Sequence, residues 1–366
     1  MRADDETTGV VGVNIAVTGL NAADTPGPGV AVVRCVKEHP RWQGRVIGLA
    51  YDALESGILD CELVDAAYLI PYPKVGRGAL LERIRYIHER ERLDVIIPTL
   101  DSEILNFIQI GDELTEMGIR TFLPTEERFT KRAKVNLHKL RDEFDIKTPA
   151  THLVSDVGKI PLLVEKYPVM VKGVFYEAYM AYSIDEAVYY CNKIAVKWGY
   201  PVLVQRYIEG EEFNAAAVGD GRGGVLAMVC MKKMVLTDKG KGWACVSIKN
   251  DGLMELTRRI IEALKWRGAL EVEAIYFKEE DAFYLIEINP RFPSWIYLAK
   301  AAGINLPYML LTAALGKNAA TPEEDAIPLD YATGVVFTNY TVNLITDLTR
   351  IQTLFTAGEI SYEKTV

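Results

Sequence analysis

Cysteine, histidine and long apolar runs are all scarce in this chain of 366 residues. The five cysteines are scattered and form no Cys-x-x-Cys pair, so the sequence predicts neither a disulfide framework nor a zinc site; buried reduced thiols are the simpler interpretation. The four histidines are dispersed, which argues against a histidine-ligated metal. No stretch of about 18 uncharged apolar residues occurs, so no membrane span is predicted.

Positive charge is also in short supply. The 41 Lys and Arg residues are outnumbered by 50 Asp and Glu residues, which gives a net charge of −9 and disfavours nucleic acid as a partner. Asp4, Asp5 and Glu6 stand where a signal peptide carries bases, so a cytoplasmic location is expected. With 49% apolar and 25% charged residues, the composition favours a compact globular protein over disorder.

The first 125 residues alternate short β-branched runs with amphipathic stretches, which is typical of a parallel sheet covered by helices. They predict a Rossmann-like α/β domain over residues 1–125. The predicted strands are 13–17, 45–50, 67–70, 95–97 and 120–123, and the predicted helices are 30–38 and a segment that contains Leu80, Ile84 and Ile87.

Three glycines between the first strand and the first helix raise a second interpretation. Gly19, Gly27 and Gly29, with Asp52 after the next strand, suggest a dinucleotide-binding loop. Their spacing is not Gly-x-Gly-x-x-Gly, so the dinucleotide interpretation is the weaker one.

The pattern changes after residue 125. A helix with Leu137, Leu140 and Phe144 on one face is predicted first, and Ser183 with Glu186 forms the signature of a second helix start. Long strands joined by tight turns then predict an antiparallel sheet. The predicted strands are 201–207, 213–218, 225–235 and 244–248, followed by a small closing element with a strand at 334–337 and a helix over 344–354.

The strongest chemical signal lies in a predicted hairpin whose apolar strands flank an acidic turn at 279–281. This turn sets Glu273 opposite Glu287 and Glu271 opposite Asn289, and alternation puts all four side chains on one face. Carboxylates crowded in this way repel each other unless they are solvated or hold a cation. An exposed polar sheet face is therefore the competing interpretation.

Arg291 follows the second strand of this hairpin and adds a guanidinium beside the acids. A few hard oxygen ligands suit Mg²⁺ that arrives with substrate phosphates. An arginine next to such an ion is what a transferring phosphoryl group needs. The combination indicates nucleotide chemistry.

Together with the segments Ala133-Lys134-Val135-Asn136 and Val169-Met170-Val171-Lys172, this hairpin resembles the ATP-grasp superfamily, in the style of its carbamoyl-phosphate synthase, biotin carboxylase and D-alanine ligase branches. The resemblance covers nearly the whole chain. It implies a two-lobed ATP-grasp domain after the first domain. The implied parts are a small lobe at 126–200, a large lobe with the metal site at 201–316, and a closing strand and helix at 317–366.

The resemblance also implies roles for individual residues. Arg291 matches the arginine that contacts the terminal phosphate or acyl phosphate. The implied metal ligands are Glu273, Glu287 and Asn289. The implied nucleotide-binding residues are Lys134, Lys172, Gln205, Arg206, Tyr207, Ile208 and Glu212, of which Glu212 matches the ribose-binding acid.

One segment departs from the family pattern. The glycine-rich loop that usually follows the second lysine is replaced by Gly173 and the largely aromatic stretch 174–179. Phosphate contacts are therefore expected from lysines elsewhere, with Lys239 and Lys241 in a glycine-containing loop assigned to catalysis beside Arg291. Lys232 and Lys233 are further candidates, with a solvated hairpin tip as the competing interpretation.

In the resembled family the first domain lines the substrate side. Asp101 and Glu103 follow a predicted strand, at the edge where ligands bind in such sheets. They could hold a substrate ammonium, or they could cap the helix that starts there.

The resemblance implies an ADP-forming carboxylate–amine ligase that acts on a small carboxylate or amino acid through an acyl phosphate, with ATP and two Mg²⁺ ions, or Mn²⁺ in their place. A bicarbonate-phosphorylating carboxylase is disfavoured because only 75 residues follow Arg291. A non-catalytic nucleotide-binding protein stays open because the glycine-rich loop is missing. A homodimer is the default expectation, without nucleic acid or membrane as a partner.

Overall fold

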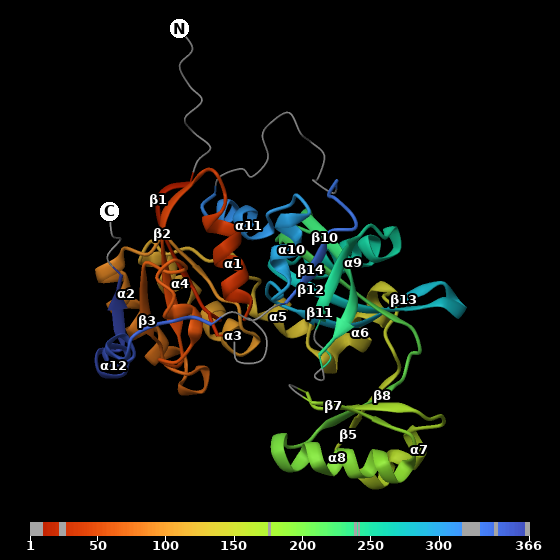
Figure 1. The fold of residues 1–366 in the computed structure, drawn as a ribbon. Helices are drawn as coiled ribbons and strands as arrows, with labels where there is room; N and C mark the ends of the chain where they lie inside the picture. Colours follow the sequence, from red (N-terminus) through yellow and green to blue (C-terminus); the bar gives the residue numbers. More distant parts are fainter. Residues whose placement is uncertain are drawn as a thin grey trace.

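The computed structural model describes residues 10–21, 27–174, 177–237, 240, 242–316, 330–339 and 343–362. These residues form three sheets, and Figure 1 shows the smallest of them standing apart from the other two. No helix among these residues is both long enough and apolar enough to cross a membrane.

The first sheet has the order β15-β3-β2-β1-β4, with β1 to β4 parallel. It is buried on both faces: Ile15 and Val17 of β1 join the same apolar cluster as Val32 of α1, while Ala16 joins Phe107 of α3 on the other side. This explains the unbroken apolar strands of the sequence. The elements are β1 Val10–Val17, α1 Pro28–Lys37, β2 Trp42–Ala50, η1 Ser56–Ile58, β3 Ala66–Leu69, η2 Pro73–Val75, α2 Arg77–Glu91, β4 Val95–Ile97, α3 Asp101–Gln109 and α4 Gly111–Glu116.

Two expectations for this region change. The predicted strand at 120–123 is wrong apart from one bridge between Val95 and Arg120, because the carbonyls of Thr121 and Leu123 accept hydrogen bonds from the Arg267 side chain instead of from a strand. Gly29 is explained by packing, since a Cβ there would lie 2.0 Å from the Thr18 carbonyl oxygen.

The second sheet is antiparallel throughout, with the order β13-β12-β9-β10-β11-β14. The amphipathic helix α9 buries Leu253, Ile260 and Leu264 against one face, and α10 and α11 belong to the cluster on the other. The elements are α5 Glu126–Lys131, η3 Lys134–Asn136, α6 Leu137–Phe144, β9 Glu211–Asp220, β10 Val225–Leu236, β11 Gly242–Ile248, α9 Asp251–Leu264, β12 Arg267–Phe277, η5 Lys278–Glu280, β13 Ala282–Asn289, α10 Ile296–Ala301, α11 Leu306–Ala314 and β14 Val336–Thr338.

The third sheet has the order β5-β8-β6-β7 and carries its own small core against α8 (Figure 1). The predicted start of α8 is confirmed, because the Ser183 hydroxyl accepts a hydrogen bond from the Glu186 backbone amide. The elements are β5 Thr151–Val154, η4 Val157–Lys159, α7 Ile160–Leu163, β6 Val169–Lys172, β7 Ala178–Ala181, α8 Ile184–Trp198 and β8 Val202–Arg206.

The C-terminal segment does not form a single closing element. Strand β14 extends the second sheet, whereas α12 (Leu348–Ala357) and β15 (Glu359–Ser361) return to the first sheet, where β15 pairs antiparallel with β3 (Figure 1). Leu354 of α12 is fully buried in the first-sheet core. The helix begins at Leu348, so Leu344 precedes it.

Candidate active site

The hairpin β12–β13 presents the predicted acidic face. Its register places Glu273 opposite Glu287 and Glu271 opposite Asn289, as the sequence predicts. A bulge just after Glu273 then shifts the register by one residue toward the tip. The shift comes after the acids, so it leaves their shared face intact.

Glu271 is the buried centre of this face, with only 5% of its surface exposed. Its Oε1 accepts hydrogen bonds from Asn214 Nδ2 at 2.9 Å and Trp295 Nε1 at 2.7 Å. Its Oε2 accepts from Asn289 Nδ2 and Arg291 Nη1, both at 3.1 Å. Four donors satisfy the lone pairs of one carboxylate. Glu271 therefore positions its neighbours and is not itself free to bind an ion.

Asn289 is oriented by two carboxylates at once. Its Nδ2 donates to Glu271 Oε2 and, at 2.9 Å, to Glu273 Oε1. Carboxylates only accept, so the amide nitrogen must face them and the amide oxygen must point the other way. The amide oxygen is thus the atom that Asn289 offers to a ligand.

Glu273 and Glu287 are held beside two lysines. Lys134 Nζ lies 3.1 Å from Glu287 Oε1, and Lys233 Nζ lies 3.8 Å from Glu273 Oε2. Burial and the nearby Glu271 raise the pKa of Glu273 above its ordinary value, against the influence of Lys233. Like charges that face each other across a strand pair need positive charge nearby, and these lysines supply part of it.

Lys172 reaches the same region from the third sheet. It ends β6, and its Nζ donates to Gln205 Oε1 of β8 at 2.8 Å. Burial, together with the nearby Lys134, lowers the pKa of Lys172 to about 8, while Glu287 and Glu273 act in the opposite direction. Lysines from separate parts of the fold therefore converge on one acidic hairpin.

Arg291 joins the hairpin to the first sheet. Its Nε donates to Asp101 Oδ2 at 2.8 Å and its Nη1 to Glu271, while its side chain keeps 18% of its surface exposed. Arg132 is close to Asp101, Glu287 and Arg291, and its buried Nε has no hydrogen-bond partner among the described residues. Two guanidinium groups thus lie where the first sheet meets the hairpin.

Comparisons with known proteins bear on the fold that carries this site. Residues 200–335 match the model of a family described as ATP-grasp in the biosynthetic pathway with Ter operon. L-amino acid ligase from Bacillus licheniformis has a similar structure, with a TM-score of 0.64 at 16% identity over 83% of this chain and 74% of that chain. Phosphoribosylglycinamide synthetase from Anaerococcus prevotii gives 0.59 at 18% identity over 84% and 76%.

A third similar structure is the biotin carboxylase domain dimer of Hydrogenobacter thermophilus 2-oxoglutarate carboxylase, in complex with MgADP, ADP and bicarbonate. It gives a TM-score of 0.65 at 17% identity over 85% of this chain and 71% of that chain. The chain has the ATP-grasp fold.

The predicted nucleotide-binding segment, residues 205–212, connects the third sheet to the second sheet. Arg206 ends β8, where its backbone amide donates to the Ala150 carbonyl, and Glu212 lies in β9 of the second sheet. Between them, Tyr207 is half-buried and Ile208 is buried. The Glu212 carboxylate is 2.9 Å from Lys233 Nζ, so the segment leads directly to the acidic hairpin.

The oxygen ligands that the β12–β13 hairpin offers fit Mg²⁺. Two carboxylates and one oriented amide oxygen, from Glu273, Glu287 and Asn289, are hard ligands in the small number that suits an ion bound with phosphates. Among the described residues there is no group of three or more His, Cys, Asp or Glu side chains that could hold a metal ion.

Some predicted residues take other places. Glu103 is fully buried, and its carboxylate accepts from the Thr99 and Leu100 amides and from the hydroxyls of Thr18 and Tyr51, so of its two proposed roles the structure supports helix capping. Lys239 and Lys241 lie outside the described residues. Lys232 pairs with Glu211 on the hairpin surface.

Lys233 is one of the further candidates for phosphate contacts that the sequence offers, whereas Arg132 was not among the predicted site residues. Burial acts to lower the pKa of Lys233, but the Glu273 and Glu212 carboxylates outweigh it and raise the pKa above its ordinary value. The alternation of β10 against β9 puts Lys233 on the face of Glu212. No sequence pattern singles out Arg132.

Proposed function

We propose that this ATP-grasp chain is an ADP-forming ligase that joins a small carboxylate to an amine. The observation that carries the proposal is the convergence of Lys134, Lys172 and Lys233 on the face of Glu273 and Glu287. A simple anion could pair with the three lysines, but it would be repelled by the two carboxylates. A nucleotide triphosphate with Mg²⁺ can, because its phosphates match the lysines and its metal matches the acids.

In this proposal ATP lies between the third and second sheets. Lys134 and Lys172 neutralise its phosphates, the backbone of residues 205–208 binds the adenine, and Glu212 binds the ribose. When bound, Mg²⁺ supplies charge neutralisation on the phosphate oxygens. Glu271 keeps the Asn289 amide oxygen and the Arg291 guanidinium in fixed directions, so little reorganisation is needed during the reaction.

The substrate carboxylate is assigned to the side of the first sheet. Arg132 offers a buried nitrogen that has no hydrogen-bond partner within the described ranges, and Arg291 lies next to it, beside Asp101. A carboxylate held by two guanidinium groups satisfies the unpaired donor and the local positive charge together. Asp101 is then within reach of an incoming ammonium group.

The reaction follows from this placement. A carboxylate oxygen attacks the γ-phosphorus of ATP, the bond to the β,γ-bridging oxygen breaks, and ADP leaves with that electron pair. The amine nitrogen then attacks the acyl carbon, phosphate leaves, and the nitrogen loses a proton to give the amide. The residues contribute positioning and charge stabilisation, so no side-chain nucleophile is required.

The proposal is tested by product analysis. The protein is incubated with ATP and Mg²⁺ and a panel of amino acids and small carboxylates, taken singly and in pairs, and ADP and amide products are measured by mass spectrometry. We expect one pair to stimulate ADP release and yield the amide. Phosphate release with bicarbonate alone would instead identify a carboxylase, and ATP binding without turnover under any mixture would identify a binding protein.

The pKa of Lys172 gives a prediction for the pH dependence. Because kcat/KM for ATP reports the free enzyme, it should fall as the pH rises through about 8, where Lys172 loses the charge that binds phosphate. Lys172→Arg should remove this fall, since a guanidinium stays protonated. The measurement is kcat/KM for ATP between pH 6.5 and 9.5 for both proteins, and identical profiles would contradict the assignment.

A further inference from the structure

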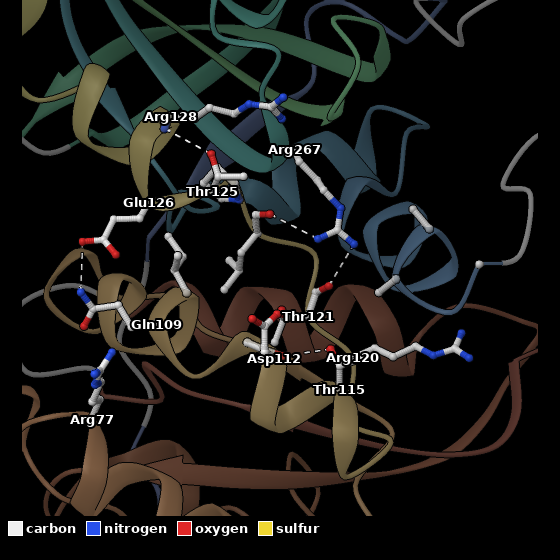
Figure 2. A pocket seen from close by; sticks show the side chains of 17 residues that line it. Arg77, Gln109, Asp112, Thr115, Arg120, Thr121, Thr125, Glu126, Arg128 and Arg267 are labelled. Carbon is white, nitrogen blue, oxygen red and sulfur yellow. Dashed lines mark hydrogen bonds between the residues drawn. The ribbon is translucent and has the colours of Figure 1, made fainter.

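A cavity of about 800 Å³ lies apart from the candidate active site and shares none of its residues. Figure 2 shows that its walls come from the first sheet's helices and from the segments that lead into the second sheet. They include the end of α3, helix α4, residues 120–128, the first residue of β12 and the end of α11. The cavity therefore lies at the junction of two parts of the fold.

Its walls carry an excess of positive charge. The charged lining residues are Arg77, Arg120, Arg128 and Arg267 against Asp112 and Glu126. In the part of the chain that the structure describes, none of these four arginines pairs with a carboxylate. The whole chain has a net charge of −9, so a concentration of unpaired arginines runs against its overall composition.

Arg267 is the most constrained of the four. Its Nη1 and Nη2 donate to the carbonyls of Leu123 and Thr121, each at 3.3 Å, and its guanidinium carbon lies over the Phe122 ring, 4.3 Å from the ring centroid. Burial lowers its pKa, and no carboxylate offsets this effect. A half-buried cation that has only carbonyl partners is one that a bound anion would stabilise.

The neighbouring arginines keep donors to spare. Arg120 Nη1 donates to the Leu315 carbonyl, and Arg128 Nη1 donates to the Gly221 carbonyl at 3.1 Å. A guanidinium has five N–H donors, so most of them stay available to a ligand. Arginine donors of this kind recognise the oxygens of phosphate and carboxylate groups.

We propose that this cavity, named here the arginine cavity, binds a small oxyanion that carries phosphate or carboxylate groups, at a site separate from the ATP site. The elements that line this cavity also carry residues of the candidate active site. Arg267 begins the strand that carries Glu271 and Glu273, and Arg128 lies in the helix that leads to Arg132 and Lys134. An anion that bridges Arg267 and Arg128 would therefore hold β12 and α5 together.

The test measures anion binding while the ATP site is filled. Inorganic phosphate and succinate are titrated separately by calorimetry into the protein saturated with Mg²⁺ and a nonhydrolysable ATP analogue, at ionic strength matched with sodium chloride. We expect one or both anions to bind, and the arm that binds identifies the ligand as phosphate-bearing or carboxylate-bearing. Absence of binding in both arms would overturn the proposal.

Variants locate the binding. Arg120→Gln and Arg77→Gln change exposed cavity residues. Each should raise the dissociation constant of the anion about tenfold, which corresponds to a loss of roughly 1.4 kcal/mol of binding free energy. Arg85→Gln makes the same change on an exposed residue of α2 outside the cavity and should leave binding unchanged. If the anion binds to all three variants with the dissociation constant of the unchanged protein, the titration has detected an adventitious ion only. Because no turnover is measured, this outcome is independent of the ligase proposal.

Discussion

Glu287→Gln should abolish Mg²⁺-dependent turnover while the protein stays folded. The substitution removes one anionic ligand at almost constant volume, and a neutral amide oxygen holds Mg²⁺ far less well than a carboxylate. The charge stabilisation at stake is several kcal/mol, so we expect kcat to fall roughly a hundredfold or more. The measurement is kcat as a function of Mg²⁺ concentration, with circular dichroism and thermal unfolding to verify the fold.

The fold should survive because Glu287 contributes little to stability. Its ion pair with Lys134 joins side chains that are 27% and 21% exposed, and a partly exposed pair of this kind is worth about 1 kcal/mol or less. Glu279→Gln provides the matched control: it makes the same change at the exposed tip of the same hairpin, where no ligand role is assigned. Equal activity of the two variants would show that the metal site is misplaced.

The sequence predicted the hairpin well because its information is local. The positions of the acids follow from two features: successive side chains of a strand point to opposite faces of the sheet, and one acidic turn joins the two strands. Both features can be identified within a short stretch of sequence. The bulge after Glu273 was not predictable, since it leaves no mark on the alternation near the acids. The pairing of β15 with β3 was not predictable either, because it joins residues about 290 positions apart in the chain.

The roles of the charged residues were harder to predict, because charge alone does not say where a side chain lies. Glu271 and Glu273 share one face and one residue type, yet the first is saturated by four donors and the second is left beside a lysine. The difference depends on Asn214 and Trp295, which come from other segments of the chain. Glu103 shows the same limit, since its burial is decided by Thr18 and Tyr51.

Arg291→Lys should reduce kcat about a hundredfold to a thousandfold, with little change in the KM for ATP. The guanidinium bonds Asp101 through Nε and Glu271 through Nη1, and one ammonium group cannot reproduce this fork. In the proposal, Arg291 holds the substrate carboxylate where that carboxylate accepts the transferring phosphoryl group, so the loss of Arg291 acts on the transition state more than on the binding of ATP. The measurement is steady-state kcat and KM for ATP at saturating Mg²⁺.

A matched variant separates this effect from lost stability. Arg45→Lys changes an arginine of the first sheet whose Nη1 pairs with the buried Glu91 at 2.7 Å, so it also weakens a buried carboxylate contact but lies outside the candidate site. Both variants should lower the thermal midpoint, and only Arg291→Lys should lower kcat. A kcat for Arg291→Lys that equals the kcat for Arg45→Lys would mean that Arg291 is a structural link between the sheets and takes no part in phosphoryl transfer.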